Sequence, residues 1–208
     1  MEASFWQQRW AAQQIGFHEA EVHPMLLSHG ASLGVVGRVF VPLCGKSNDM
    51  IWLRAQRHEV VGIELAELAV RAFFDEHGMR AAQTAQAPFE VFSADGYRLL
   101  CGDYFALTNV QLGDFGAVYD RAALIALPAD MRRDYAKKMS ELCASGTVML
   151  LITVEYDASV ITPPPFVVSA EEVTALYGRD WTIASRGTQA ADVKGQPGTE
   201  QAFVLRRL

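Results

Sequence analysis

Short apolar runs alternate with helix-like stretches along this chain, and this alternation limits its possible folds more than any other feature. The runs at 38–42, 59–64, 117–120 and 148–154 are strand-length, and amphipathic stretches with capping residues lie between most of them. Strands that alternate with helices are typical of a parallel sheet with helices on both faces. We therefore predict an α/β protein with a doubly wound, mostly parallel sheet.

Two further patterns predict antiparallel pairing. The runs at 89–92 and 97–101 flank Ala94-Asp95-Gly96, which is a strong hairpin signal. The runs at 181–186 and 202–205 follow one another without an intervening helix, which predicts an antiparallel edge strand. The length of 208 residues fits a single domain spanning 1–208.

Composition excludes several classes of protein. The net charge is −6 and the cations are scattered, so we expect no nucleic acid partner. The longest apolar run, 148–154, is far shorter than the ~20 residues of a membrane span, and no secretory signal begins the chain. The three cysteines form no C-x-x-C pair, which favours a reduced cytoplasmic location. No exposed apolar stripe stands out, and we expect a monomer.

The loop after the first predicted strand is the candidate cofactor site. In a doubly wound sheet, ligands bind beyond the carboxyl ends of the strands, where strand order reverses. Gly45 lies in this loop, and Glu64 ends the second strand 19 positions later (64 − 45). This spacing is close to the ~20 residues that place an acid on the ribose hydroxyls of a nucleotide. The alternative is an ordinary exposed acid at a strand end.

The glycine pattern argues against a phosphate-bearing cofactor. Gly45-Lys46-Ser47 matches the end of a P-loop, but the position that needs the first glycine is Phe40. The G-x-G-x-x-G pattern of dinucleotide-binding proteins is also missing. A nucleoside without phosphate groups, such as S-adenosylmethionine, needs no such cradle.

Two more strand ends carry candidate ligand-binding residues. Asp103 and Tyr104 follow the hairpin, where a short acid can accept from an amino group while the next side chain packs on a ring. Asp103 could equally be a turn residue before a helix. Arg121 ends another strand at the same edge and either orders a loop or faces an anion. His18 and His23 are five positions apart and diverge by about 140° on a helix, so we expect no metal site.

Several of these segments together resemble the thiopurine S-methyltransferase family, particularly its bacterial members. The Pro42-Leu43-Cys44-Gly45-Lys46 element, with the Trp…Gly-Phe-His start of the chain, is specific to that family. The matching segments lie in order along most of the chain: Phe5-Trp6 with Trp10, 15–18, 39–47, 61–65, 100–103, 119–124, 156–157 and 164–166.

The resemblance implies a class I S-adenosylmethionine-dependent methyltransferase fold, which is Rossmann-like, with residues 1–30 as an N-terminal helical lid. It also implies a role for each of several residues. S-adenosylmethionine would contact Trp10, Leu43, Glu64 and Arg121, with Asp103 and Tyr104 beside the adenine and Phe17 near the substrate.

The resemblance implies methyl transfer to thiopurines or other small heteroaromatic thiols. For this reaction we expect Arg121 to be the catalytic residue, because its positive charge would favour the thiolate form of the acceptor. Two alternatives stay open. One is methylation of reduced selenium or tellurium compounds, such as a selenol, which would serve metalloid detoxification and tellurite resistance. The other is a non-catalytic nucleoside-binding module. Family members often carry arginines before the last strand, whereas Lys194 is the only cation of 187–201.

Overall fold

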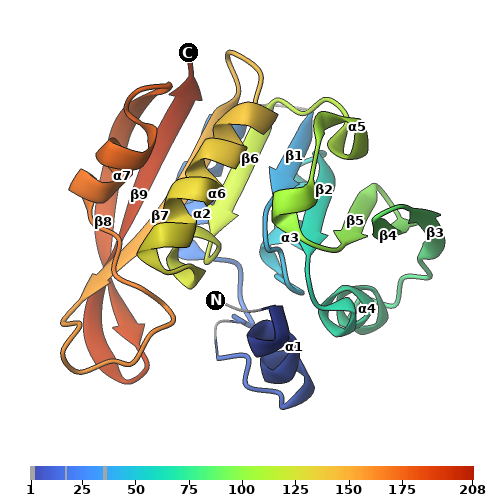
Figure 1. Cartoon of the computed structure of the whole chain (residues 1–208), viewed down its shortest axis with the longest axis horizontal. Coiled ribbons are helices and arrows are strands. Elements are labelled where there is room, and N and C mark those ends of the chain that lie inside the picture. The colour runs from blue at the N-terminus through green and yellow to red at the C-terminus, as the bar shows by residue number, and fades with distance from the viewer. Residues whose placement is uncertain (1–2, 17, 35–36) are drawn as a thin grey trace.

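The computed structural model describes residues 3–16, 18–34 and 37–208. Its centre is one nine-stranded sheet with the strand order β3-β4-β5-β2-β1-β6-β7-β9-β8 (Figure 1). The strands are β1 (Arg38–Val41), β2 (Glu59–Glu64), β3 (Ala82–Gln86), β4 (Phe89–Ala94), β5 (Tyr97–Cys101), β6 (Ala117–Arg121), β7 (Val148–Tyr156), β8 (Trp181–Val193) and β9 (Gln196–Arg207).

Five central strands, β5-β2-β1-β6-β7, run parallel to one another. The chain builds outward from β1 to β2 and β5 and then returns to β6 on the other side of β1. Strand order therefore reverses between β1 and β6, which is the position where α/β sheets bind their ligands. The predicted parallel sheet is confirmed.

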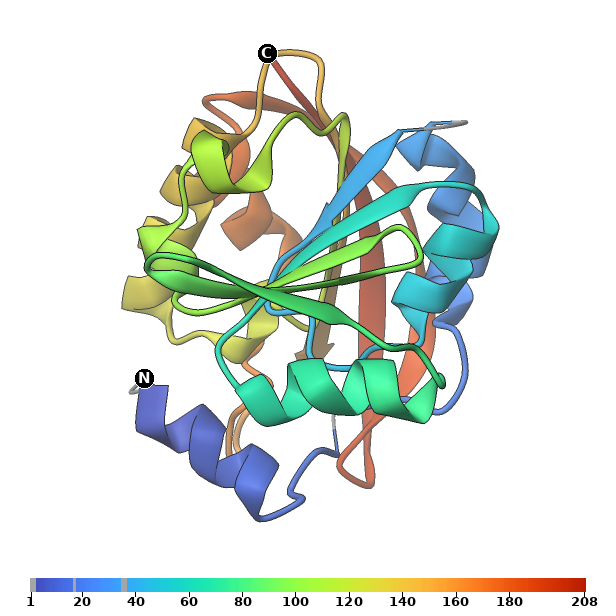
Figure 2. The same cartoon turned by 90° about the vertical axis from the view of Figure 1, so that its right-hand side faces the viewer.

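Helices cover both faces of the sheet (Figure 2). The helices on the two faces are α2 (Pro24–His29), α3 (Asp49–Ala55), α4 (Glu67–Glu76), α5 (Asn109–Leu112), α6 (Ala129–Leu142) and α7 (Ala170–Tyr177). The first helix, α1 (Ala3–Ala11), belongs to neither layer and packs against α4. Successive strand residues point to opposite faces, so Phe40 and Val61 pack with α5, α6 and α7, whereas Val39 and Val60 pack with α2, α3 and α4. Two apolar layers thus hold the parallel strands in place.

Antiparallel strands extend both edges of the sheet, although we predicted one such edge. The confirmed hairpin of β4 and β5 is joined by β3, whose sequence Ala-Gln-Thr-Ala-Gln lacks the apolar alternation of a half-buried strand. At the other edge, β8 and β9 pair over almost their whole length. Within the described part of the chain, no helix is long and apolar enough to cross a membrane.

Candidate active site

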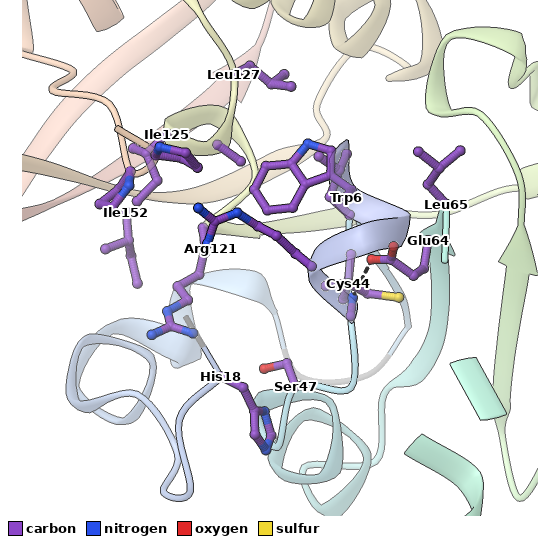
Figure 3. A pocket seen from close by; sticks show the side chains of 18 of the residues that line it. Trp6, His18, Cys44, Ser47, Glu64, Leu65, Arg121, Ile125, Leu127 and Ile152 are labelled. Atoms are coloured by element: carbon purple, nitrogen blue, oxygen red, sulfur yellow. Dashed lines mark hydrogen bonds between the residues drawn. The ribbon is translucent and has the colours of Figure 1, made fainter. Parts of the chain in front are cut away.

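A cavity of about 450 Å³ lies at the carboxyl ends of the parallel strands. Its wall combines α1, the loops after β1, β2, β5 and β6, and the tip of the β8–β9 hairpin (Figures 1 and 3). Six residues predicted to bind the cofactor all line this cavity: Trp10, Leu43, Glu64, Asp103, Tyr104 and Arg121. Phe17, the predicted substrate contact, lies outside the described residues.

The loop after β1 is pressed against the end of β2. The Cys44 backbone N–H donates to the Ile63 carbonyl at 2.9 Å, and Leu43 and Gly45 have φ values of 46° and 53°. The Cys44 side chain lies over Gly62, where an added Cβ would come within 2.8 Å of the Cys44 sulfur and of a Leu99 methyl. The close approach of this loop therefore requires glycine at position 62.

Replacing Gly62 by alanine should push this loop off β2. Overpacking of a filled core commonly costs about 1–3 kcal/mol, and we expect a loss of that size in the free energy of unfolding, measured by urea denaturation. Gly116→Ala is the matched control, because a Cβ at Gly116 would meet nothing within 4 Å. Equal stability of the two variants would contradict this account of the loop.

Glu64 is the acid at the tip of β2, and its side chain is buried beside the loop (Figure 3). One carboxylate oxygen accepts from the Gly45 N–H at 2.9 Å and the other from the Ala66 N–H at 2.8 Å. Burial raises the pKa of Glu64, and these backbone hydrogen bonds oppose that rise. Each oxygen keeps a second lone pair, so the carboxylate can still accept from hydroxyl donors in the cavity.

Trp10 closes the cavity over the same loop. Its side chain is 7% exposed and packs against Ala66 and Ala69. The indole ring lies 3.2 Å from the position that a Cβ on Gly45 would take. Trp10 thus holds α1 against both the cofactor loop and α4.

Asp103 and Tyr104 stand at the end of β5. The Asp103 carboxylate accepts from the Phe105 N–H at 2.9 Å and caps a short 3₁₀ helix, which is the turn role that the sequence left open. The buried Tyr104 ring stacks on Tyr135 with centroids 4.6 Å apart, and its hydroxyl donates to the Tyr135 carbonyl at 3.2 Å. Because the Tyr104 hydroxyl already donates its hydrogen bond within the protein, Tyr104 can contact a ligand in the cavity mainly by packing of its ring.

Arg121 lies on the Ile125 and Ile152 side of the cavity, away from Glu64 (Figure 3). Its side chain is 12% exposed, and one guanidinium nitrogen is 3.0 Å from a carboxylate oxygen of Glu19. Glu19 is 58% exposed and belongs to the segment that follows α1. This ion pair joins the N-terminal segment to the end of β6.

Glu200, which the sequence did not point to, also lines this side of the cavity. One of its oxygens accepts from Gln189 at 2.8 Å and lies 3.1 Å from His23 Nε2. Burial alone would raise the pKa of Glu200. The hydrogen bonds from His23 and Gln189 and the charges of His23 and Arg121 outweigh burial, so the net effect is a pKa below the usual value. The site therefore presents a carboxylate in the electrostatic range of Arg121.

Asp120 supports Arg121 from inside the core. Its fully buried carboxylate accepts from the Tyr135 hydroxyl at 2.7 Å and from the Leu124 N–H at 3.2 Å. Burial raises the pKa of Asp120 from 3.8 to about 6, although these hydrogen bonds lower it. The residue thus fixes the backbone beyond β6 while resisting ionisation.

This raised pKa predicts a pH dependence of stability. The folded state binds the Asp120 proton more tightly than the unfolded state, so ionisation opposes folding as the pH rises. The free energy of unfolding should fall by up to about 3 kcal/mol as the pH rises from 3.8, the ordinary pKa of the Asp120 carboxyl, to about 6, its pKa in the folded protein. Above that pH, Asp120 should cause no further loss. Urea denaturation from pH 4 to pH 7 measures this slope. Asp120→Asn should flatten it, and an unchanged slope would contradict the assignment.

The fold and the site together define a class of protein. A structure of 1,6-didemethyltoxoflavin-N1-methyltransferase from Burkholderia thailandensis, solved with S-adenosylhomocysteine bound, superposes on this chain with a TM-score of 0.71. The match covers 99% of this chain and 86% of that chain at 15% identity, so it concerns the fold alone. The protein has the class I methyltransferase fold that was predicted.

Sequence comparison narrows this class to one family. The family model for thiopurine S-methyltransferase matches residues 1–206. The thiopurine S-methyltransferase of Pseudomonas syringae pv. syringae is 46% identical over 91% of this chain and 87% of its own length. That of Azotobacter vinelandii is also 46% identical, over 93% of this chain and 88% of its own. The chain belongs to the thiopurine S-methyltransferase family.

Proposed function

We propose that this protein transfers a methyl group from S-adenosylmethionine to the sulfur of thiopurines or other small heteroaromatic thiols. The observation that carries this proposal is the family match over residues 1–206, with relatives of that name at 46% identity. The cavity at the strand-order reversal supports it independently, because it combines an apolar wall with a few convergent polar groups.

The residues around the loop after β1 suit the cofactor. Glu64 would accept from the ribose hydroxyls, Trp10 and Leu43 would wall the site, and Asp103 with Tyr104 would lie beside the adenine. The loop offers no phosphate cradle, which a cofactor without phosphate groups does not need. When bound, S-adenosylmethionine supplies a methyl group already activated by its positively charged sulfur.

The other side of the cavity suits the methyl acceptor. The Arg121 guanidinium would favour the thiolate form of the acceptor, since a nearby positive charge stabilises an anion. The side chains of Ile125 and Ile152 beside it are apolar and would exclude water from the acceptor, which strengthens that interaction. We retain Phe17 as a proposed substrate contact on the resemblance of its surrounding motif. No protein nucleophile is needed.

The N-terminal segment has the character of a lid over one domain that spans 1–208. Trp6, Arg9 and Trp10 of α1 line the cavity, and the Arg121–Glu19 ion pair ties the following segment to β6. Met25 and Leu26 of α2 are buried in the core instead. Of the 1–30 region, α1 and the residues up to Glu19 are therefore the part that we propose to move.

We also propose a cytoplasmic, monomeric enzyme without a nucleic acid partner. The three cysteines are free thiols, which supports a reducing compartment. The net charge of −6 opposes binding to a polyanion.

An acceptor panel tests the reaction and separates the alternatives. Methyl transfer is measured with 6-mercaptopurine, with its oxygen analogue hypoxanthine, and with a benzeneselenol. We expect a thiol to give the highest kcat/KM and hypoxanthine to give none. A selenol far above every thiol would favour the metalloid alternative. Cofactor binding without transfer to any acceptor would favour a nucleoside-binding module.

A further inference from the structure

Two cations from distant parts of the chain line the cavity: the half-buried Arg9 and the exposed Lys194, whose position marks the mouth of the cavity. Arg9 belongs to α1, and Lys194 lies at the tip of the β8–β9 hairpin. Both line the cavity, and α1 and this tip lie at the same end of the sheet in both views (Figures 1 and 2). Neither cation has been given a role in binding the cofactor or in the transfer itself.

The Arg9 side chain packs on an aromatic ring, but one of its buried N–H groups has no hydrogen-bond acceptor among the described residues. Its guanidinium lies 4.8 Å from the centroid of the Phe5 ring, and its Nε atom is buried with no hydrogen-bond partner among the described residues. A buried donor without an acceptor is costly, so an acceptor atom from a ligand would relieve this cost. Successive helix residues point about 100° apart, and of these two neighbours it is Trp10 that packs against Gly45.

Lys194 lies in a tight turn between β8 and β9. Lys194 and Gly195 form the two-residue loop of the hairpin, with φ values of 53° and 79°, and the Asp192 carboxylate accepts from the Gly195 N–H at 2.8 Å. The Lys194 ammonium donates to the Thr162 carbonyl at 2.8 Å, which leaves two of its three protons for other acceptors.

The positive charges of Arg9 and Lys194 repel each other. Burial and the positive charge of Arg9 both lower the pKa of Lys194. Neither side chain forms an ion pair with a carboxylate among the described residues. An anion between them would remove the repulsion and gain two attractions.

We propose that Arg9 and Lys194 form an anion-binding subsite for an acidic group on the methyl acceptor. The preferred acceptors are then aromatic thiols that carry a carboxylate away from the sulfur. The thiol points inward to Arg121, and the carboxylate stays at the mouth between α1 and the hairpin. This inference rests on the proposed function and adds the substrate class to it.

A pair of thiols of similar size tests the subsite. 4-Mercaptobenzoate carries the carboxylate, and 4-methylbenzenethiol replaces it with a neutral methyl group. KM for both is measured with the native protein, Arg9→Gln, Lys194→Gln and the double variant. Since exposed ion pairs contribute up to about 1 kcal/mol, we expect each single change to raise the KM ratio of acid to neutral thiol up to about fivefold. The double variant should raise it further.

The control is Arg179→Gln, which removes an exposed cation outside the cavity wall and should leave the ratio unchanged. Added salt should raise KM for 4-mercaptobenzoate in the native protein and have little effect in the double variant. Calorimetric titration with S-adenosylhomocysteine gives a separate readout of the cofactor site.

Two results would overturn the proposal. A KM ratio that the double variant does not change removes the subsite, whether KM for the two thiols stays the same or rises equally for both. Weaker binding of S-adenosylhomocysteine with an unchanged KM ratio would assign the two cations to the cofactor. A native protein that methylates neither of these thiols nor any thiol of the wider panel would instead refute the proposed function itself.

Discussion

Replacement of Glu64 by alanine should raise the dissociation constant for S-adenosylhomocysteine on the order of 10- to 100-fold, since hydrogen bonds to a charged group contribute ~1.5–3 kcal/mol. Two losses combine in this variant. The proposed acceptor of the ribose hydroxyls disappears, and the buried N–H groups of Gly45 and Ala66 lose their partner. Isothermal titration calorimetry measures the effect directly.

Glu59→Ala is the matched control for this prediction. Glu59 begins the same strand at its opposite end, where its exposed side chain pairs with Arg38. Its loss should leave the affinity for S-adenosylhomocysteine unchanged. Glu64→Asp keeps the charge and should bind with intermediate affinity, which guards against a variant that fails to fold. Native affinity in a folded Glu64→Ala protein would remove the ribose assignment.

Replacement of Arg121 by alanine should lower kcat for thiol methylation on the order of 10- to 100-fold, because a charge-assisted contact to the thiolate is lost. The acceptor thiol would also ionise less readily in the site. The rise of kcat with pH should therefore move to higher pH, and a more acidic thiol should recover part of the lost rate.

Two variants separate this role from a general effect of charge or folding. Arg121→Lys keeps the charge without the planar fork and should restore only part of the rate. Arg38→Ala removes an arginine that is ion-paired at the opposite end of the sheet, and it should leave the pH profile unchanged. A native rate and pH profile for Arg121→Ala at saturating cofactor would exclude the proposed catalytic role.

The central strands could be predicted from the sequence, because each is a short apolar run that can be recognised without knowing its partners in the fold. The central strands are apolar runs of strand length, and β2 begins and ends at the predicted residues, Glu59 and Glu64. Because parallel strands end at one edge, the residues that follow β1, β2, β5 and β6 had to come together, and they do line one cavity. Their placement was predictable, whereas their roles in binding remain proposals.

The positions of Lys194 and Glu200 in the cavity wall were harder to predict. Residues 196–201 contain proline, glycine and polar side chains, so only 202–205 was expected to be a strand. Pairing with β7 extends β9 through this segment and carries Glu200 to the cavity. The same extension places Lys194 in the wall of the cavity that Arg9 also lines, an arrangement of distant sequence positions that no local pattern contains. The two-residue Lys194-Gly195 turn was the one available signal.

The most direct measurement follows a labelled methyl group from S-adenosylmethionine to 6-mercaptopurine and identifies the product by mass spectrometry. The proposed function predicts a product methylated on sulfur, formed in many turnovers by the native protein and much more slowly by Arg121→Ala. A protein that binds S-adenosylmethionine but transfers no methyl group to 6-mercaptopurine or to any other thiol would contradict it.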